Sequence, residues 1–209
     1  MKRKTLYFRH LKFSITCVMM NDKLKEEIRQ TQEILKNGGV ILYPTDTIWG
    51  LGCDATNEDA VKKIYEIKKR TDNKSMLVLL EDAGKIASYA NVPDIALDLI
   101  EVADKPTTII YPGAKRLAPS LIAEDGTIGI RITKEEFTRS LLFRFNRPIV
   151  STSANISGEP SPKFFGEISE EIKNAVDYIV DYRRNDHKPA SPSSIIKLGL
   201  GGEIEIIRK

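Results

Sequence analysis

Apolar positions along the chain alternate between helical spacing and short continuous runs, which is typical of a mixed α/β protein. Leu24, Ile28 and Leu35 recur at helical spacing, and two glycines follow them. The uninterrupted apolar run at residues 76–80 indicates a buried central strand. The same criteria predict helices at 22–37, 57–70, 82–89, 93–103, 134–145 and 167–175. They predict the other strands at 39–43, 107–111, 127–132, 148–150, 178–180, 194–198 and 203–207.

The order of these elements favours one domain. Helices separate the strands near the start of the chain, whereas the last two strands form a hairpin across Gly199–Gly202. The expected fold class is therefore α/β, with helices packed on a twisted mixed sheet. The 209 residues suffice for one domain with a sizeable core. We expect that domain at residues 21–209, after an N-terminal extension at 1–20 that is disordered or reflects a start codon placed too early.

The composition is that of an ordinary globular protein, with 41% hydrophobic and 29% charged residues. No apolar stretch is long enough to cross a bilayer, so we expect no membrane association. The two cysteines, Cys17 and Cys53, fit reduced thiols better than a disulfide framework. With His10 and His187 as the only histidines, a histidine-based metal site or a Ser/His/Asp triad is close to excluded. These features together predict a cytoplasmic protein.

Basic residues concentrate at the start of the chain. The first 18 residues hold five lysines and arginines and no acidic residue, a charge of +5. Since the whole chain carries +3, the remainder carries 3 − 5 = −2. A near-neutral body argues against a nucleic-acid-binding surface on the folded part.

Two strand-like runs end in clusters of small, hydrogen-bonding residues. The run at 39–43 leads into Pro44–Thr47 and then Gly50–Gly52, whereas the run at 148–150 leads into Ser151–Gly158. Open α/β sheets bind ligands at the carboxyl ends of their strands. Two such strand ends in one small domain predict a single polar ligand pocket.

The spacing within each cluster supports that prediction. Thr45 and Thr47 alternate with Asp46, so in an extended segment both hydroxyls face one way. Ser153 and Asn155 have the same spacing and offer a hydroxyl and a carboxamide. An ordinary turn at each strand end explains these residues equally well.

Three cations, Lys68, Arg70 and Lys74, lie between the end of a helix and the start of a strand. Basic side chains commonly complement the dipole at a helix C-terminus, and this structural explanation is favoured when the cations are taken alone. The functional alternative is a phosphate clamp, because arginine presents a planar fork to phosphate oxygens and lysine a compact charge. Arg131 ends an otherwise apolar strand and is either a rim residue or a carboxylate binder.

Other motifs are weaker. No Walker-type loop is present, and Gly50–Gly52 lacks the third glycine of a dinucleotide fingerprint. Spacing alone does not decide whether Ser193 and Arg208 belong to a site or to the surface.

Three segments in series resemble the YrdC family. They are Pro44–Thr47 with Gly50–Gly52, Lys68-x-Arg70 with Lys74, and Ser153–Asn155 with Ser157–Gly158. The resemblance covers about residues 23–208 and implies a twisted sheet around a large cationic cavity. The best-known members of the family are L-threonylcarbamoyladenylate synthases. The resemblance therefore implies that ATP, bicarbonate and L-threonine react to give threonylcarbamoyl-AMP and pyrophosphate, and that a separate transferase complex uses the product to modify adenosine in tRNA.

Site residues carry over from the family by position. The residues implied to bind threonine are Thr47, Arg131, Ser153 and Ser193. The residues implied to bind ATP are Arg70, Lys74, Thr127, Asn155, Lys163 and Arg208. Lys68 and Arg70 are assigned the catalytic role, and Lys163 is expected to act through its backbone.

Three positions depart from the family pattern. Thr71 stands where proline is common, Leu79 where some members have a histidine, and Thr133 in place of the proline of Arg-x-Pro. A leucine at residue 79 would remove one contact to threonine. The sequence ends at Lys209, without the second domain of the larger family members, so it resembles the single-domain form.

The implied chemistry needs no protein nucleophile. The threonine amine captures bicarbonate or CO₂, and the resulting carbamate attacks the α-phosphate of ATP as pyrophosphate leaves. Catalysis is then a matter of positioning and electrostatic stabilisation. We expect Mg²⁺ to accompany ATP and to be held by phosphates and water, because no paired carboxylates stand out as ligands.

Three other functions stay open. A basic cavity can attract an RNA backbone, and family members have been linked to double-stranded RNA, so weak RNA binding is the first. The second is a paralogue with another nucleotide-dependent substrate, and the third is catalytically silent nucleotide binding. The intact Ser153 and Asn155 favour the synthase over the paralogue.

Overall fold

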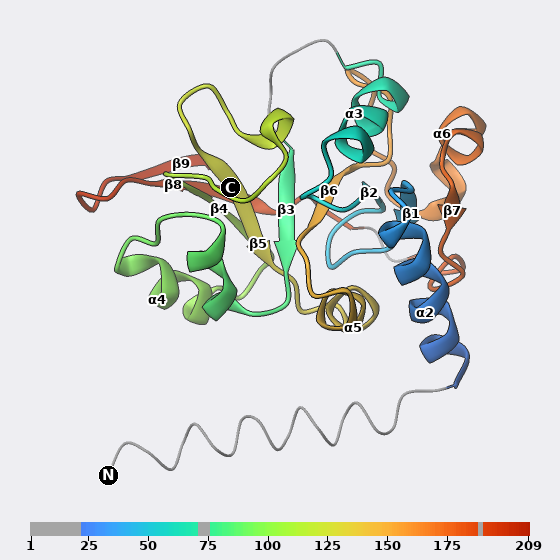
Figure 1. The fold of residues 1–209 in the computed structure, drawn as a ribbon, viewed down its shortest axis with the longest axis horizontal. Helices are drawn as coiled ribbons and strands as arrows, with labels where there is room; N and C mark the ends of the chain where they lie inside the picture. Colours follow the sequence, from blue (N-terminus) through green and yellow to red (C-terminus); the bar gives the residue numbers. More distant parts are fainter. Residues whose placement is uncertain (1–21, 71–75, 188–189) are drawn as a thin grey trace.

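All nine strands in the described part of the chain belong to one twisted sheet, in the order β7-β1-β2-β6-β3-β5-β4-β8-β9 (Figure 1). The structure is a computed structural model that describes residues 22–70, 76–187 and 190–209. Its strands are β1 (Ile41–Tyr43), β2 (Gly50–Gly52), β3 (Leu77–Leu80), β4 (Thr107–Tyr111), β5 (Ile128–Ile132), β6 (Ile149–Ser153), β7 (Tyr178–Ile179), β8 (Ser194–Leu198) and β9 (Ile204–Arg208). Its helices are α2 (Asp22–Lys36), α3 (Glu58–Ile67), α4 (Ile95–Val102), α5 (Glu136–Phe145) and α6 (Glu170–Ala175), with short 3-10 turns at Ala83–Ser88, Pro119–Leu121 and Phe165–Glu167.

Parallel and antiparallel pairs are mixed across this sheet. The pairs β1–β7, β3–β5 and β4–β8 are parallel, and the other neighbours are antiparallel. The predicted mixed α/β fold is thereby confirmed. Strand β6 lies between β2 and β3, although the chain reaches it only after β5. Its pairing places Ser153 opposite Gly50, so the two polar segments of the sequence meet in space.

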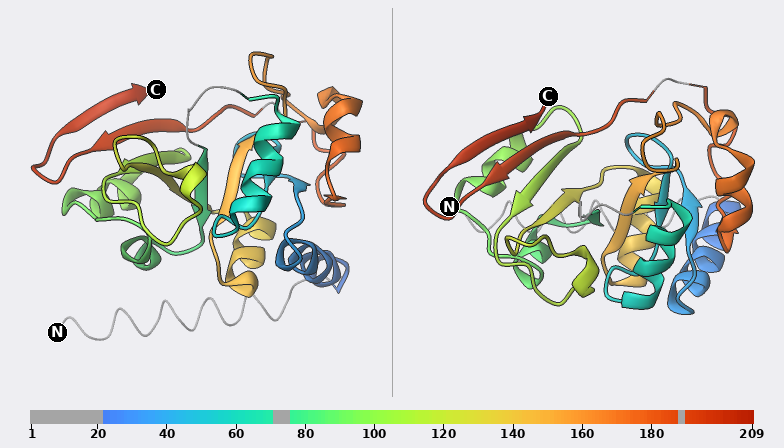
Figure 2. Two further views of the ribbon diagram at one scale, coloured as in Figure 1. Left: turned by 45° about the horizontal axis from the view of Figure 1, so that its top comes forward. Right: turned by 90° about the horizontal axis from the view of Figure 1, so that it is seen from above.

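Helices cover both faces of the sheet near its centre. On one face, Ile28 of α2 and Leu141 of α5 share a buried cluster with Leu79 of β3. On the opposite face, Ile64 of α3 shares a second cluster with Val78. Successive residues of a strand point to opposite faces, which is why Val78 and Leu79 belong to different cores. Figure 2 shows the two ends of the sheet, with the β8–β9 hairpin at one and α6 beside β7 at the other.

Strand β2 is the element that the sequence pattern does not predict. Its Gly-Leu-Gly run resembles a turn, yet both glycines are buried in the strand and neither has a positive φ. A β-carbon on Gly52 would lie 2.6 Å from Cε1 of Tyr43 and 2.8 Å from the carbonyl oxygen of Val150. Glycine therefore serves close packing between β1 and β6 rather than a turn.

The other predicted elements are confirmed, although several begin or end up to three residues away from the predicted bounds. The predicted helix at 82–89 is a 3-10 turn, and the strand predicted at 148–150 continues to Ser153. The predicted extension at 1–20 lies outside the described residues. Across the described residues, no helix combines the length and the apolar character that a membrane crossing needs.

Candidate active site

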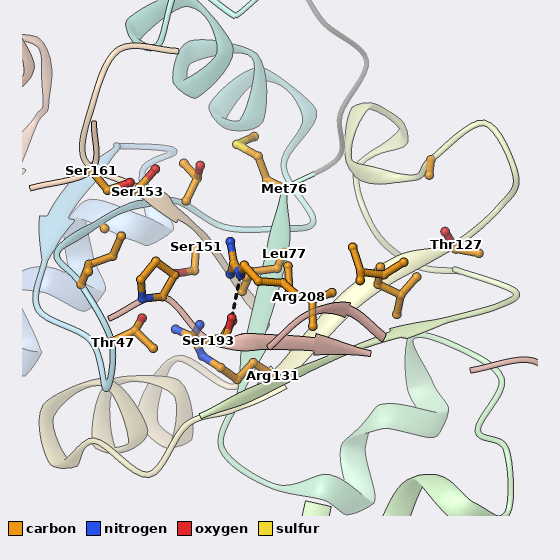
Figure 3. A pocket seen from close by; sticks show the side chains of 18 of the residues that line it. Thr47, Met76, Leu77, Thr127, Arg131, Ser151, Ser153, Ser161, Ser193 and Arg208 are labelled. Carbon is orange, nitrogen blue, oxygen red and sulfur yellow. Dashed lines mark hydrogen bonds between the residues drawn. The ribbon is translucent and has the colours of Figure 1, made fainter. Parts of the chain in front are cut away.

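A cavity of about 870 Å³ opens on one face of the sheet (Figure 3). Residues that line the cavity come from β2, β6, β3, β5, β4, β8 and β9. These strands are consecutive neighbours in the sheet. Its polar and charged lining residues are Thr47, Arg70, Glu124, Asp125, Thr127, Arg131, Ser151, Thr152, Ser153, Ser161, Ser193 and Arg208. The two strand ends that are rich in hydroxyls thus open into the same cavity.

The cavity lies on the face of the sheet that α5 also packs against. Helix α5 covers one part of this face, and the cavity occupies the part beside it. Leu79 and Ile149 are paired and lie in the core with α5. One pair further along the same face, Leu77 lies opposite Ser151, and both line the cavity. Gly129 continues this row on β5, where a β-carbon would lie 3.4 Å from Cβ of Leu77. The small side chain of Ser151 therefore leaves space that a ligand can occupy.

The loop between β1 and β2 turns two threonine hydroxyls toward each other. Oγ1 of Thr45 accepts the backbone N–H of Thr47 at 3.0 Å and donates to the carbonyl of Ile48 at 2.8 Å. The two Oγ1 atoms are 2.9 Å apart. The chain bends at 46–48 instead of staying extended, so only Thr47 lines the cavity, while Thr45 is buried behind it. The expectation that both hydroxyls face one way is wrong for this reason.

Arg131 projects from β5 into the cavity and is only 3% exposed. Its Nη2 lies 3.0 Å from Oδ1 of Asp46, a contact between charges that is not aligned as a hydrogen bond. Within the described residues, Nε and Nη2 of Arg131 have no hydrogen-bond partner. Buried donors in folded proteins are almost always hydrogen-bonded, so this guanidinium is suited to bind a ligand.

Ser193 and Arg208 lie on the same side of the cavity as Arg131 (Figure 3). Oγ of Ser193 is 2.8 Å from Oγ1 of Thr108, and Nε of Arg208 donates to the carbonyl of Ser193 at 2.9 Å. Burial and the charge of Arg131 lower the pKa of Arg208. A bound anion would relieve this repulsion between two guanidinium groups.

Thr127 is held on another wall of the cavity by Asp125. The hydroxyl and the backbone N–H of Thr127 donate to Oδ1 of Asp125, at 2.7 and 3.1 Å. Nζ of Lys197 donates to the other carboxylate oxygen at 2.7 Å. Hydrogen bonds from Lys197 and Thr127 lower the pKa of Asp125 to about 2. This carboxylate is therefore ionised at neutral pH and fixes the position of Thr127.

Lys68 supports the wall of the cavity and does not line it. Its Nζ donates to the carbonyl oxygens of Ser153 and Asn155, at 2.7 and 2.6 Å, and the residue is 2% exposed. Burial and the charge of Arg70 lower the pKa of Lys68 to about 8. Lys68 thus fastens the end of α3 to the end of β6, and Arg70 faces the cavity two residues later. Lys74 lies outside the described residues.

Ser153 and Asn155 do not share a face, contrary to the expectation from their spacing. Ser153 is the last residue of β6 and lines the cavity. Nδ2 of Asn155 instead donates to the carbonyls of Ile156 and Glu159, at 3.0 and 2.7 Å. The two-residue alternation ends with the strand, so it no longer applies at Asn155. Asn155 shapes the loop that follows.

Lys163 also lies apart from the cavity lining. Its side chain is exposed, and its backbone N–H donates to Oε2 of Glu167 at 2.8 Å. Of the three departures from the family pattern, Leu79 lies in the core with α5, and Thr133 is buried and accepts the N–H of Glu135 at 3.3 Å. The third departure lies outside the described residues.

The sequence pattern does not single out Asp46, Thr108 or Ser151 as members of the site. A signal for Asp46 existed, because Arg131 in an otherwise apolar strand needs a buried counter-charge. Ser151 begins the polar cluster at 151–158, whereas no such signal exists for Thr108. Register alone places Thr108 opposite Arg131 and Ser151 opposite Leu77.

The described residues contain no group of three histidine, cysteine or acidic side chains that could hold a metal ion. In the cavity, Asp125 already accepts bonds from Thr127 and Lys197. A metal ion there would have to be held mainly by the phosphates of a ligand.

The sequence matches one family model over most of its length. That model, Sua5/YciO/YrdC, is described as telomere recombination and matches residues 33–209. The chain belongs to the Sua5/YciO/YrdC family. The resemblance to YrdC proteins seen in the three sequence segments is thereby confirmed.

Three relatives of this Sua5/YciO/YrdC protein carry the name threonylcarbamoyl-AMP synthase, one of them provisionally. Threonylcarbamoyl-AMP synthase of Pseudoalteromonas translucida is 33% identical over 151 residues, which is 70% of this chain and 81% of that protein. The protein of the same name from Idiomarina loihiensis is 32% identical and covers 76% of this chain and 86% of its own length. A Methanocaldococcus jannaschii protein, provisionally named for the same activity, is 39% identical over 83% of each chain.

Solved structures confirm the family fold. The crystal structure of Escherichia coli YciO has a TM-score of 0.75 at 26% identity, over 87% of this chain and 88% of YciO. Pyrococcus abyssi Sua5, solved in complex with L-threonine, has a TM-score of 0.73 at 26% identity over 82% of this chain. The match covers 50% of that Sua5, so this chain spans about half its length.

Proposed function

We propose that this protein is an L-threonylcarbamoyladenylate synthase, a nucleotidyltransferase that converts L-threonine, bicarbonate and ATP into threonylcarbamoyl-AMP and pyrophosphate. One observation carries the proposal: the buried Arg131, two of whose nitrogens lack hydrogen-bond partners among the described residues, opens into the same cavity as Arg70 and Arg208. Three relatives named for this activity and a Sua5 solved with L-threonine support it.

The amino-acid side of the proposed site lies around Arg131. Its guanidinium would bind the threonine carboxylate, because arginine matches the planar geometry of carboxylates. The hydroxyl of Thr45 already donates to Ile48, so the hydroxyl of Thr47 must donate to Thr45. Thr47 therefore keeps its lone pairs and can accept a bond from the amine of the amino acid. Ser193 would contact the substrate beside it.

The nucleotide side of the proposed site uses Arg70, Thr127 and Arg208. The two guanidinium groups would bind phosphate oxygens, and Mg²⁺ would enter as part of the substrate MgATP. The cavity of about 870 Å³ is within the range of small-molecule pockets and leaves room for a nucleotide beside a small amino acid.

The reaction would proceed in two steps. The threonine nitrogen bonds to the carbon of bicarbonate or CO₂ and loses a proton, which gives a carbamate and, from bicarbonate, water. A carbamate oxygen then bonds to the α-phosphorus, the bond to the bridging oxygen breaks, and pyrophosphate leaves with its electron pair. Arg70 would stabilise charge on the phosphoryl oxygens, while Arg131 holds the amino acid in place. Lys68 would act indirectly, by holding Ser153 in position.

The product would pass to a separate transferase complex that modifies tRNA in the cytoplasm. No observation on the described residues favours RNA binding, a different substrate or silent nucleotide binding as the main role.

A pyrophosphate-release assay with each substrate omitted in turn tests this function. We expect release to require ATP, L-threonine and bicarbonate together, and mass spectrometry to detect threonylcarbamoyl-AMP. Serine serves as a matched control, because it lacks only the methyl group of threonine. Absence of release with all three substrates, or release that ignores the omission of threonine, would refute the assignment.

A further inference from the structure

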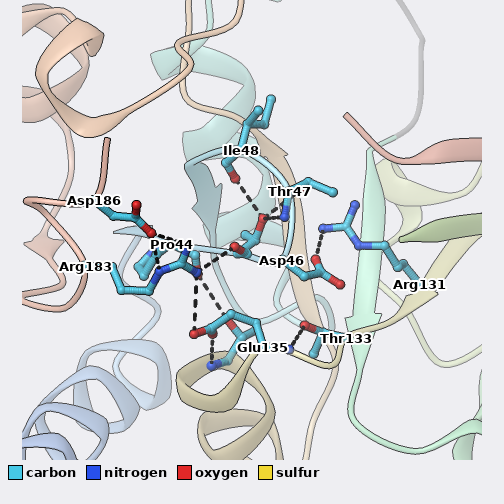
Figure 4. Close-up of polar contacts among 11 residues, drawn as sticks. Pro44, Asp46, Thr47, Ile48, Arg131, Thr133, Glu135, Arg183 and Asp186 are labelled. Atoms are coloured by element: carbon cyan, nitrogen blue, oxygen red, sulfur yellow. Dashed lines mark hydrogen bonds and ion pairs between the residues drawn. The ribbon is translucent and has the colours of Figure 1, made fainter. Parts of the chain in front are cut away.

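The loop between β1 and β2 carries two residues of the proposed threonine site, Asp46 and Thr47, but belongs to no strand. Two side chains from elsewhere in the chain donate to its backbone (Figure 4). Oγ1 of Thr138, on α5, donates to the carbonyl of Pro44 at 3.0 Å. Nη1 of Arg183 donates to the carbonyl of Thr45 at 3.2 Å.

The guanidinium of Arg183 is itself held in place from two directions. Its Nε and Nη2 both donate to Oδ2 of Asp186, at 3.2 and 2.8 Å. Its Nη1 lies 3.8 Å from Oε1 of Glu135, whose side chain is 7% exposed. The other oxygen of Glu135 accepts the backbone N–H of Thr138 at 2.7 Å and so caps α5. Arg183 thus links the loop to the start of the helix that supplies the second donor.

The backbone at Arg183 has an unusual conformation, and its side chain points toward the loop. Its φ is +57°, a left-handed conformation that residues other than glycine rarely adopt. The backbone N–H of Asp186 donates to the carbonyl of Arg183 at 3.1 Å and closes a turn. A strained conformation persists where surrounding contacts maintain it, and both this turn and the guanidinium bonds of Arg183 are such contacts.

We propose that Arg183 is a positioning residue for the amino-acid substrate. It does not line the cavity, and it holds the backbone of Thr45 so that Thr47 and the Asp46–Arg131 pair face the substrate. The proposal rests on the function proposed above and adds a residue to its threonine site. Arg70 and Thr127 are anchored on other segments, so loss of Arg183 should affect threonine far more than ATP.

The test combines kinetics with hydrogen exchange on Arg183→Ala and Arg183→Lys. In Arg183→Ala we expect KM for threonine to rise about tenfold while KM for ATP stays within twofold, because small displacements of positioning groups have large effects. Amide exchange in residues 45–48 should become at least tenfold faster. Arg183→Lys keeps the charge without the planar fork, so it should recover part of both effects.

Arg184→Ala is the matched control. Arg184 has nearly the same exposure, 34% against 37%, but it donates to the carbonyls of Ile179 and Val180 instead of the loop. It should leave both the KM ratio and the exchange of residues 45–48 unchanged. Equal changes in both KM values for Arg183→Ala, or unchanged exchange in the loop, would overturn the proposal. If the unmodified protein released no pyrophosphate, the proposed function would fail instead, and the exchange data would still decide whether Arg183 orders the loop.

Discussion

The two sides of the cavity are built differently. On the proposed amino-acid side, Thr45, Arg131 and Ser193 are each 3% exposed, and each contacts another side chain: Thr47, Asp46 and Thr108, respectively. Of the two cations proposed to bind the nucleotide, Arg70 is half-buried, and Arg208, which adjoins the amino-acid side through its bond to Ser193, is exposed. The internal contacts of the first side hold its groups in place, which suits selection of a small substrate by a few positioned groups. The second side consists mainly of cations near solvent, which suits phosphates that carry their own charge and metal ion.

Substitution of Arg131 should have the largest effect. Arg131→Leu removes the proposed carboxylate-binding group and leaves the carboxylate of Asp46, whose side chain is 11% exposed, without its partner charge. We expect kcat/KM for threonine to fall about a thousandfold and the free energy of unfolding to fall by about 3 kcal/mol. Steady-state kinetics and urea unfolding measure the two effects. The double variant Arg131→Leu/Asp46→Asn should regain stability without activity. Activity of Arg131→Leu within tenfold of the parent would contradict the placement of Arg131 in the amino-acid site.

Arg70 tests the nucleotide side. Arg70→Ala should retain its fold, because the side chain faces the cavity, and should lose about 2–4 kcal/mol of transition-state stabilisation, by analogy with single donors in oxyanion sites. Pyrophosphate release under saturating threonine measures this. The neighbouring Lys69→Ala is the control, because Lys69 is exposed and pairs with Glu171 at 2.6 Å. A near-normal rate for Arg70→Ala, or an equal loss for Lys69→Ala, would remove Arg70 from the site.

Lys68 should contribute to the stability of the fold, because its side chain joins the end of α3 to the end of β6. Lys68→Met leaves the carbonyls of Ser153 and Asn155 without their donor, which should cost about 2 kcal/mol of unfolding free energy. In the folded protein the pKa of Lys68 is lowered from 10.5 to about 8, so between these values the unfolded chain binds more protons. Stability of the parent should therefore rise with pH above 8, by up to about 1.4 kcal/mol per pH unit.

Denaturant unfolding at pH 7.5 and 9.5 measures this rise. Lys68→Met should lack the contribution of the lysine, so the stability difference between parent and variant should grow with pH. A constant difference across this range would show that Lys68 keeps its ordinary pKa.

Lys163 should have the smallest effect. Its side chain is exposed, and its backbone N–H donates to Glu167. Lys163→Ala should change KM for ATP by less than twofold in the same kinetic assay. A change of tenfold or more would mean that the side chain of Lys163 binds ATP although it does not line the cavity.

Sequence alone determined the fold class and most of the elements. Helical and strand periodicity depend on residues close together in the chain, so the helices, the central strand Leu77–Leu80 and the final hairpin could all be predicted. The segment that carries Thr47 and the segment that carries Ser153 were also recognisable as polar strand ends. Of the sequence-based site residues, Thr47, Arg70, Thr127, Arg131, Ser153, Ser193 and Arg208 line one cavity.

Only the tertiary structure decided which polar groups face that cavity. The contacts of Lys68 and Asn155 could not be predicted: Nζ of Lys68 and Nδ2 of Asn155 each donate to two backbone carbonyls. Asp46 became visible as the partner of Arg131, and Arg183 as the support of its loop, because their contacts join segments far apart in the chain. Local patterns specify which elements form. The direction of a side chain beyond the end of a strand depends on long-range packing, which no short window of sequence contains.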